Sequence, residues 1–411
     1  MSSSQRLSSL TSHSAYDSAL EIIQNLHKNG FQAMFAGGCV RDALLGKPPK
    51  DLDIATSARP SEVETLFANT LSVGKDFGVI VVVTDFGPIE VASFRSDGPY
   101  EDGRRPSSIQ FTNAKEDALR RDFTINALFY DPIEQELFDF VGGVQDLKLK
   151  IIRAVGDPVL RFQEDKLRML RAVRFLAQLG FAVEEKTELA ISQNASEINQ
   201  VSKERLFNEM HRLLGSAYWI KGLLLLKRTG LANYIWPELS FSQYDLKQFR
   251  FEDSREWELS FCAINVMIDA EMQAEARLYS WGAPKKSIRR VLEIFENSAR
   301  VVDEKSTRAQ RIRAIGSDQY AEVLAIARLR LAKQRKSTQV LSQWIGEYLA
   351  VTGPSAKMPA PLVSGADLIQ IGFSADKKLG EILKLLYDEQ LELKFSSKLE
   401  GLRLAKTLRQ A

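Results

Sequence analysis

The chain has 411 residues, and its 55 lysines and arginines against 53 aspartates and glutamates leave a formal net charge of only +2. This balance gives no global basic character from which nucleic-acid binding can be argued, so any basic surface must be local. The two cysteines, Cys39 and Cys262, make neither a zinc pattern nor a disulfide framework, and no run approaches the ~18 apolar residues that span a membrane, so we expect a cytoplasmic protein.

The first part of the chain, to residue 145, is predicted to mix short strands with helices. It opens on a polar segment without the apolar core of a signal peptide. Apolar residues then follow helical or alternating spacing, and glycines bound the segments. A polar, turn-rich stretch from Ser96 to Asn113 has a length that is usually functional or disordered inside a compact domain. The expected helices are 15–29, 40–45 and 61–67, and the expected strands are 31–36, 51–55, 79–84 and 89–94.

After residue 145 the pattern becomes helical and stays so, with a Pro/Gly/Ser-rich hinge at 351–361. We expect a mixed head (1–145), followed by a helical neck (146–215), body (216–350) and tail (351–411). The basic helices of the body suit an RNA backbone, and the alternative is a set of ordinary solvated helix faces. Their basic residues are Lys285, Lys286, Arg289, Arg290, Arg308, Arg311, Arg313, Arg328, Arg330, Lys333, Arg335 and Lys336.

The most informative run is Gly37-Gly38-Cys39-Val40-Arg41-Asp42, followed by Lys50-Asp51-Leu52-Asp53. Adjacent glycines let a backbone approach a phosphate closely. On a strand, Asp51 and Asp53 would point the same way. Mg²⁺ that acts on nucleoside triphosphates is commonly held by one or two carboxylates plus the phosphates. The run therefore predicts metal-assisted attack on a nucleoside triphosphate, with a solvated acidic turn as the alternative.

Glu90 is the candidate for a third metal ligand. It is an acid in an otherwise apolar strand, between Ile89 and Val91. A third carboxylate on a neighbouring strand would complete a two-metal site, and the alternative is an exposed strand face.

Five ordered motifs between about residues 31 and 215 closely resemble those of class II tRNA nucleotidyltransferases and bacterial poly(A) polymerases. The resemblance implies an α+β protein, in which a polymerase-beta-like nucleotidyltransferase head with a mixed sheet precedes all-helical neck, body and tail. It also implies that the head is catalytic, that the neck recognises the nucleotide base, and that the body and the tail bind RNA. The first motif is the run described above. The others are Arg120-Arg121-Asp122-Phe123-Thr124 with Asn126-Ala127, Asp139 with Gly142-Gly143 and Asp146-Leu147, Glu164-Asp165 with Arg168-Met169, Arg171-Ala172 and Arg174-Phe175, and, more loosely, Ser202-Lys203-Glu204-Arg205 with Glu209.

The resemblance places the phosphates of a nucleotide on the first two motifs. Gly37 and Gly38 would hold the triphosphate through backbone N–H groups. Arg41 would neutralise phosphate charge, or alternatively brace Asp42 within the protein. Arg121 would reach the phosphates, and the alternative is a solvated basic pair with its neighbour.

The resemblance also assigns the ribose and the metal. Asp122 and Asn126, four residues apart, would bond the ribose hydroxyls from one helical face. Two Mg²⁺ ions would be held by Asp51, Asp53 and Glu90, which are therefore the expected catalytic and metal-binding residues.

The fourth motif is expected to read the base. Glu164, Asp165 and Arg168 would lie on one helix, with Asp165 accepting and Arg168 donating hydrogen bonds on one face, as a Watson–Crick-like edge that selects cytosine and adenine. The alternative is an ordinary salt bridge within a helix. Arg171 and Arg174 of the same motif are also expected to bind the nucleotide.

The expected reaction is template-independent addition of CCA to the 3′ end of tRNA from CTP and ATP. Within the stretch 96–113, Asp102-Gly103-Arg104-Arg105-Pro106 resembles a flexible element that switches related enzymes from C to A addition and that C-only members lack. The alternatives are a poly(A) polymerase, an A-adding tRNA nucleotidyltransferase and, remotely, a catalytically silent RNA-binding relative. Lys75–Val79 and Ser364–Leu368 favour the CCA-adding branch. The expected partners are the tRNA 3′ end, CTP and ATP, with no membrane. The sequence does not fix the oligomeric state, and a monomer is the default expectation.

Overall fold

The computed structural model describes residues 7–98, 107–239, 256–353 and 357–410. The chain forms two compact units, Met1–Leu239 and Ser240–Ala411. The first unit contains the predicted head and neck, and the boundary between the units falls inside the region predicted as body. Within the described residues, no helix has the length and apolar character needed to cross a membrane.

A seven-stranded sheet with the order β3-β4-β5-β2-β1-β8-β9 forms the centre of the head. Only β2 and β5 pair in parallel, and the other neighbours are antiparallel, so the sheet is mixed as predicted. The sequence analysis did not identify β3, β8 or β9. The strands are β1 (Ala33–Ala36), β2 (Asp53–Thr56), β3 (Thr70–Gly74), β4 (Val79–Thr84), β5 (Gly87–Ser93), β8 (Leu128–Asp131) and β9 (Glu136–Asp139).

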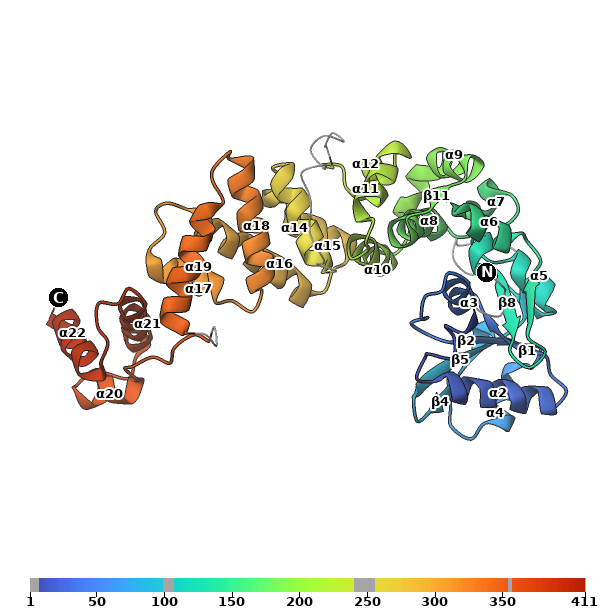
Figure 1. Ribbon diagram of the computed structural model, residues 1–411, viewed down its shortest axis with the longest axis horizontal. Coiled ribbons are helices and arrows are strands. Elements are labelled where there is room, and N and C mark those ends of the chain that lie inside the picture. The colour runs from blue at the N-terminus through green and yellow to red at the C-terminus, as the bar shows by residue number, and fades with distance from the viewer. Residues whose placement is uncertain (1–6, 99–106, 240–255, 354–356, 411) are drawn as a thin grey trace. The chain divides into compact units, whose positions relative to one another are not determined.

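Alternate residues of β1 face different helices, because successive side chains of a strand point to opposite faces. Phe35 stacks on Tyr16 of α2, with 5.8 Å between ring centroids. Met34 instead belongs to a core with Ala114 and Ala118 of α5. Figure 1 shows these elements as the blue and teal part of the chain. The remaining elements of the head are α2 (Tyr16–Lys28), α3 (Gly38–Leu44), α4 (Pro60–Leu66), η1 (Lys75–Phe77), α5 (Ala114–Leu119) and η2 (Thr124–Asn126).

The turn-rich stretch from Ser96 to Asn113 is less irregular than expected. Its two ends pair as the antiparallel strands β6 (Arg95–Asp97) and β7 (Ile109–Phe111). The segment Asp102-Gly103-Arg104-Arg105-Pro106, to which the switching role was assigned, lies outside the described residues.

The neck begins at a tightly packed turn. The Asp139 carboxylate accepts hydrogen bonds from successive backbone N–H groups at the start of α6, and a Cβ added to Gly143 would lie 2.2 Å from the Thr124 carbonyl oxygen. The neck is helical as predicted, apart from the two-residue parallel strands β10 and β11. Its elements are α6 (Gly143–Leu149), β10 (Ile151–Ile152), α7 (Pro158–Glu164), α8 (Leu167–Leu179), β11 (Ala182–Val183), α9 (Glu185–Asn194), η3 (Ala195–Gln200) and α10 (Lys203–Leu214). Helices α11 (Trp219–Arg228) and α12 (Ala232–Ile235) complete the first unit and lie in the region predicted as body.

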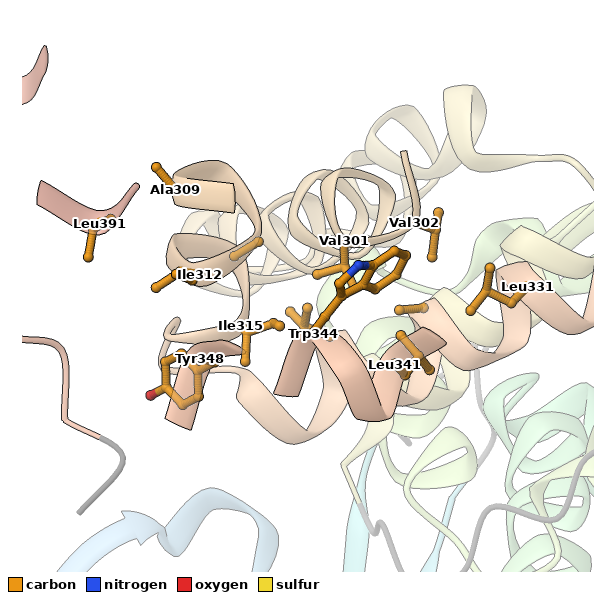
Figure 2. Close-up of a cluster of buried hydrophobic side chains, with 13 residues drawn as sticks. Val301, Val302, Ala309, Ile312, Ile315, Leu331, Leu341, Trp344, Tyr348 and Leu391 are labelled. Atoms are coloured by element: carbon orange, nitrogen blue, oxygen red, sulfur yellow. The ribbon is translucent and has the colours of Figure 1, made fainter. Parts of the chain in front are cut away.

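The described part of the second unit is helical, as predicted. Figure 2 shows one of its cores, where Trp344 packs among Val301, Ile315 and Leu341. Ser364 begins the tail motif as a helix N-cap, since its hydroxyl accepts from the Asp367 N–H. The elements are α14 (Trp257–Met267), α15 (Glu271–Trp281), α16 (Lys285–Val302), α17 (Arg308–Ile315), α18 (Tyr320–Lys333), α19 (Gln339–Thr352), α20 (Gly365–Gln370), α21 (Lys377–Leu391) and α22 (Lys398–Gln410).

Candidate active site

The two adjacent glycines join β1 to α3. Gly37 has φ of +71°, which favours glycine, and a Cβ there would lie 2.8 Å from Nη1 of Arg121. Its N–H donates to the Leu128 carbonyl at 2.9 Å, so the prediction that this N–H holds a phosphate is wrong. Gly38 is the first residue of α3, where backbone N–H groups have no partner within the helix. At this turn, a ligand can therefore contact the backbone of Gly37, which has no side chain, and accept a hydrogen bond from the N–H of Gly38.

Asp53 and Glu90 face each other on neighbouring strands. They are paired residues in the parallel register of β2 and β5, and so share a face of the sheet. Asp51 lies just before β2, in a bend, so the expectation of two carboxylates on one strand is wrong. Burial, followed by the charges of Glu90 and Asp51, raises the pKa of Asp53 to about 6.

These carboxylates suit a hard divalent cation by their chemistry. Their donors are all oxygen atoms, which Mg²⁺ prefers. A cation would also offset the burial, and the repulsion from Glu90 and Asp51, that together raise the pKa of Asp53. Within the described residues, no group of three or more His, Cys, Asp or Glu side chains is gathered as a metal site. Asp51 and Glu90 lie near enough to Asp53 to act on its charge, but the three carboxylates are not a preassembled three-ligand cage.

Asp122 and Asn126 are hydrogen-bonded to each other, and they do not lie on one helical face as predicted. Asp122 lies in a bend before η2, which corrects the predicted helix, and its Oδ1 accepts from Nδ2 of Asn126 at 3.1 Å. Burial raises the pKa of Asp122, but the opposing charge of Arg171 and the hydrogen bonds bring it down to about 2. Asp122 therefore stays ionised and orients Asn126 toward the site.

Arg41 contacts Asp42 within the protein, which is the alternative that the sequence left open. Its guanidinium bonds Asp42 at 2.8 Å and Oδ1 of Asn126 at 2.6 Å. It also lies 5.3 Å from the ring centre of Phe175. Arg41 therefore supports the wall of the pocket, and only its remaining N–H groups can donate to a phosphate.

The base-reading motif is broken by the end of a helix. Helix α7 ends at Glu164, and Asp165 has extended backbone angles before α8 begins. Arg168 pairs with Glu164 at 2.5 Å, whereas Asp165 pairs with Arg205 at 2.7 Å. The predicted side-chain pair of Asp165 and Arg168 on one helical face is therefore wrong. The two side chains remain neighbours on the wall of one cavity, which is described below.

Three arginines surround the ring of Phe175. The guanidinium carbon of Arg174 is 3.9 Å from the ring centre, and that of Arg171 is 5.5 Å away. Arg174 also forms a buried ion pair with Glu209, and burial lowers its pKa to about 10 despite that pair. Arg171 pairs with Asp122 at 2.6 Å. The neck thus presents a fixed row of guanidinium groups.

One cavity of about 550 Å³ brings these groups together. Asp53 and all ten residues predicted to bind the nucleotide line it, whereas Asp51 and Glu90 do not. Its walls carry eight arginines against three aspartates, which suits a polyanion such as a triphosphate. The lining residues are Gly37, Gly38, Arg41, Asp53, Arg120, Arg121, Asp122, Asn126, Asp165, Arg168, Arg171, Arg174, Phe175, Arg205 and Arg212.

Four lining residues had no predicted role. Arg120, Phe175 and Arg205 lie inside the recognised motifs, and their place in those motifs could have indicated a role in the site. Arg212 stands outside them, and its only signal is its spacing: with Arg205 and Glu209 it follows the i, i+4, i+7 pattern of one helical face.

Many basic residues of the predicted body already form ion pairs with acidic side chains of the protein. Seven of the twelve form ion pairs with carboxylates, for example Arg330 with Glu271 and Arg313 with Asp388. Their charge is therefore partly neutralised within the protein, which favours the ordinary-surface alternative for these seven.

Two protein families match the first part of the chain. The Poly A polymerase head domain matches residues 33–153, and the probable RNA and SrmB-binding site of polymerase A matches residues 180–242. The first match covers most of the predicted head and the start of the neck, and the second runs from the predicted neck into the predicted body.

Curated relatives and a solved structure are named more specifically than these two families, as CCA-adding enzymes. The CCA-adding enzyme of Geobacillus stearothermophilus is 45% identical over 59% of this chain, and the chain spans that same share, 59%, of the relative's length. The CCA-adding enzyme of Bacillus licheniformis is 36% identical over 85% of this chain and 87% of its own. The crystal structure of the Bacillus stearothermophilus CCA-adding enzyme in complex with CTP has a TM-score of 0.76 at 31% identity, covering 97% of this chain and 99% of that one.

Proposed function

The chain belongs to the family of CCA-adding enzymes, and we propose that it adds C, C and A to the 3′ end of tRNA from CTP and ATP, releasing pyrophosphate. The single observation that carries the proposal is the cavity in which Asp53 and the ten predicted nucleotide-binding residues meet. These residues come from separate stretches of the chain, and only the fold of the first unit brings them together.

The triphosphate is proposed to lie against the arginine-rich wall, beside Gly38. There the RNA 3′-hydroxyl attacks the α-phosphorus, and the bond to the leaving pyrophosphate breaks. Arg121 stands over the turn at Gly37, anchored to Asp117, so its guanidinium is held in place before any ligand arrives. A prearranged cation stabilises developing negative charge without the cost of moving during the reaction.

We propose that Asp51, Asp53 and Glu90 hold two Mg²⁺ ions. When bound, such ions lower the pKa of the attacking hydroxyl and neutralise the leaving group. The ionised form of Asp53 is needed for binding, and its raised pKa means that this form dominates only above about pH 6.

The base is proposed to be read by Asp165 and Arg168. An ionised Asp165 accepts hydrogen bonds only, so it favours the exocyclic amino groups of cytosine and adenine over the carbonyls of uracil and guanine. Arg168 donates only, and Glu164 fixes its direction. A protein edge of this kind selects a base without a template.

The remaining expectations are part of the same proposal. The regions 1–145, 146–215, 216–350 and 351–411 are proposed as catalytic head, neck, and RNA-binding body and tail. Cys39 and Cys262 are both free and buried, which agrees with a reducing cytoplasm. We propose a monomer as the working state.

The deciding experiment incubates the purified protein with Mg²⁺ and a tRNA transcript that lacks its 3′ CCA. CTP alone, ATP alone and both together are supplied, and the products are sized to one nucleotide. Two C additions followed by one A and a stop are expected. A long ladder from ATP alone would establish the poly(A) polymerase that the names of the two matching families favour, and a single A on a CC end would establish A-only addition.

A further inference from the structure

Helix α10 contributes Arg205 and Arg212 to the wall of the cavity, and Glu209 lies between them on the same helical face. Arg205, Glu209 and Arg212 are spaced i, i+4 and i+7, so they project in the same direction. Arg205 bonds Asp165 at the base-reading end, and Glu209 bonds Arg174 in the middle. Arg212 lies about 10 Å further along the helix axis than Arg205, at 1.5 Å per residue.

Arg212 differs from the other arginines that line the cavity. Each of the other seven donates to a carboxylate, most of them at more than one point. The guanidinium of Arg212 has no such partner among the described residues, and only its backbone carbonyl accepts a bond, from Ser216. Its side chain is exposed. Arg212 therefore lines the cavity with all five donors and its full charge available.

We infer that Arg212 contacts a phosphate group of a bound substrate, an inference that rests on the proposed function. The guanidinium fork suits phosphate oxygens, and a residue about 10 Å from the base-reading end faces the ribose-phosphate part of a ligand. Two sources offer that chemistry: the triphosphate of CTP or ATP, and the last phosphodiester of the RNA. Because neither source involves the base edge, Arg212 acts equally on C and A addition.

The test compares Arg212→Ala and Arg212→Lys with Lys203→Ala. Lys203 is an exposed cation on the same helix that does not line the cavity, so its variant controls for a general loss of positive charge. Unfolding temperatures are measured first, and we expect them to match the wild type because Arg212 holds no other side chain.

Equilibrium binding of CTP, of ATP and of a tRNA transcript lacking its CCA end is then measured for each variant. We expect Arg212→Ala to weaken one of the two substrate classes by about tenfold, Arg212→Lys to weaken it less, and Lys203→Ala to leave it unchanged. If the RNA is the source, the slope of log K against log salt concentration falls by about one. If the triphosphate is the source, CTP and ATP weaken equally while RNA binding stays constant.

Wild-type binding of both substrates by Arg212→Ala would overturn the inference, and so would an equal loss in Lys203→Ala. Since these measurements need no turnover, they are separate from the test of the proposed function. A wild-type protein that incorporates no nucleotide into RNA would refute that function, whatever the variants bind.

Discussion

Arg205 of α10 donates to the carboxylate of Asp165 at 2.7 Å, across the break between α7 and α8. Oδ1 of Asp165 also accepts from the Leu167 N–H at 3.1 Å. One bond therefore fixes the carboxylate to the backbone at the start of α8, and the other fixes it to α10. The proposed base-reading edge depends on α10 as well as on the motif that contains it.

Arg205→Ala is expected to lower the CTP-over-UTP preference by about tenfold or more, since a hydrogen bond to a charged group contributes about 1.5–3 kcal/mol. Relative kcat/KM for the two nucleotides measures the effect. Arg228→Ala is the matched control, because it removes an arginine–carboxylate pair with Glu188 that does not line the cavity. An unchanged preference in Arg205→Ala would remove Arg205 from base selection.

Arg168→Ala is expected to relax the preference for C and A over U and G by about tenfold or more, because a site built to hydrogen-bond a base rejects the wrong one strongly. The affinity for the triphosphate should change less, since the other arginines of the cavity remain. Incorporation of each nucleotide, with the KM of each, separates the two effects. If CTP and UTP lost activity in equal proportion, Arg168 would be a general anion contact.

Asp51→Ala and Asp53→Ala are each expected to abolish incorporation, by about 10²–10³-fold or more, the loss typical of removing one stabiliser of transition-state charge. RNA binding should remain nearly intact in both variants, as judged by equilibrium titration. Asp85→Ala is a suitable control, since it removes an exposed acid of the head that does not line the cavity. Retained turnover in either variant would refute the metal assignment.

Asp53 also predicts a pH dependence of stability. Its pKa in the folded protein, about 6, lies above the unfolded value of about 3.9, so the folded state binds more protons between these values. The free energy of unfolding should therefore fall as the pH rises from about 4 to about 6. Asp53→Asn removes this loss, and at about pH 8 it should be roughly 1–3 kcal/mol more stable than the wild type, with no such gain at about pH 4.

Denaturant titrations at both pH values measure this difference. Mg²⁺ should stabilise the wild type at the higher pH and have little effect on Asp53→Asn, because binding to the folded state alone adds stability. A gain in stability that is the same at both pH values would show that the ionisation of Asp53 is not its cause.

Gly37→Ala tests the close approach of Arg121. The new Cβ would lie 2.8 Å from Nη1 of Arg121, so the guanidinium must move, and kcat/KM should fall by about 10²-fold because positioning is lost. Gly30→Ala is the control. Gly30 also has positive φ, at +84°, but nothing lies within 4 Å of its Cβ position. Both variants should lose about 1–2 kcal/mol of stability, and equal activity losses would contradict the role of Arg121.

The motifs singled out residues that line one cavity. Some of these residues are held by a contact within their own motif, as Asp122 is with Asn126, and others by a contact between motifs, as Asp165 is with Arg205. The motifs predicted the pairing of charges poorly. Neither glycine nor proline marks the break at Asp165. The sequence therefore predicted one continuous helix across α7 and α8, with Asp165 beside Arg168. The strand β3 was missed for a related reason: its residues are largely exposed at a sheet edge, and they lack the alternation of a half-buried strand.

The parallel register of β2 and β5 makes catalysis sensitive to how the sheet assembles. Asp53 faces Glu90 only while these strands pair as observed, and a slip by one residue would turn Glu90 to the opposite face. These two strands are distant in sequence, and such long-range pairings are slow to form. Nucleotide incorporation during refolding should therefore be among the last properties to return, after the helical signal. The activity of this protein is thus also a measure of whether its central ladder has formed correctly.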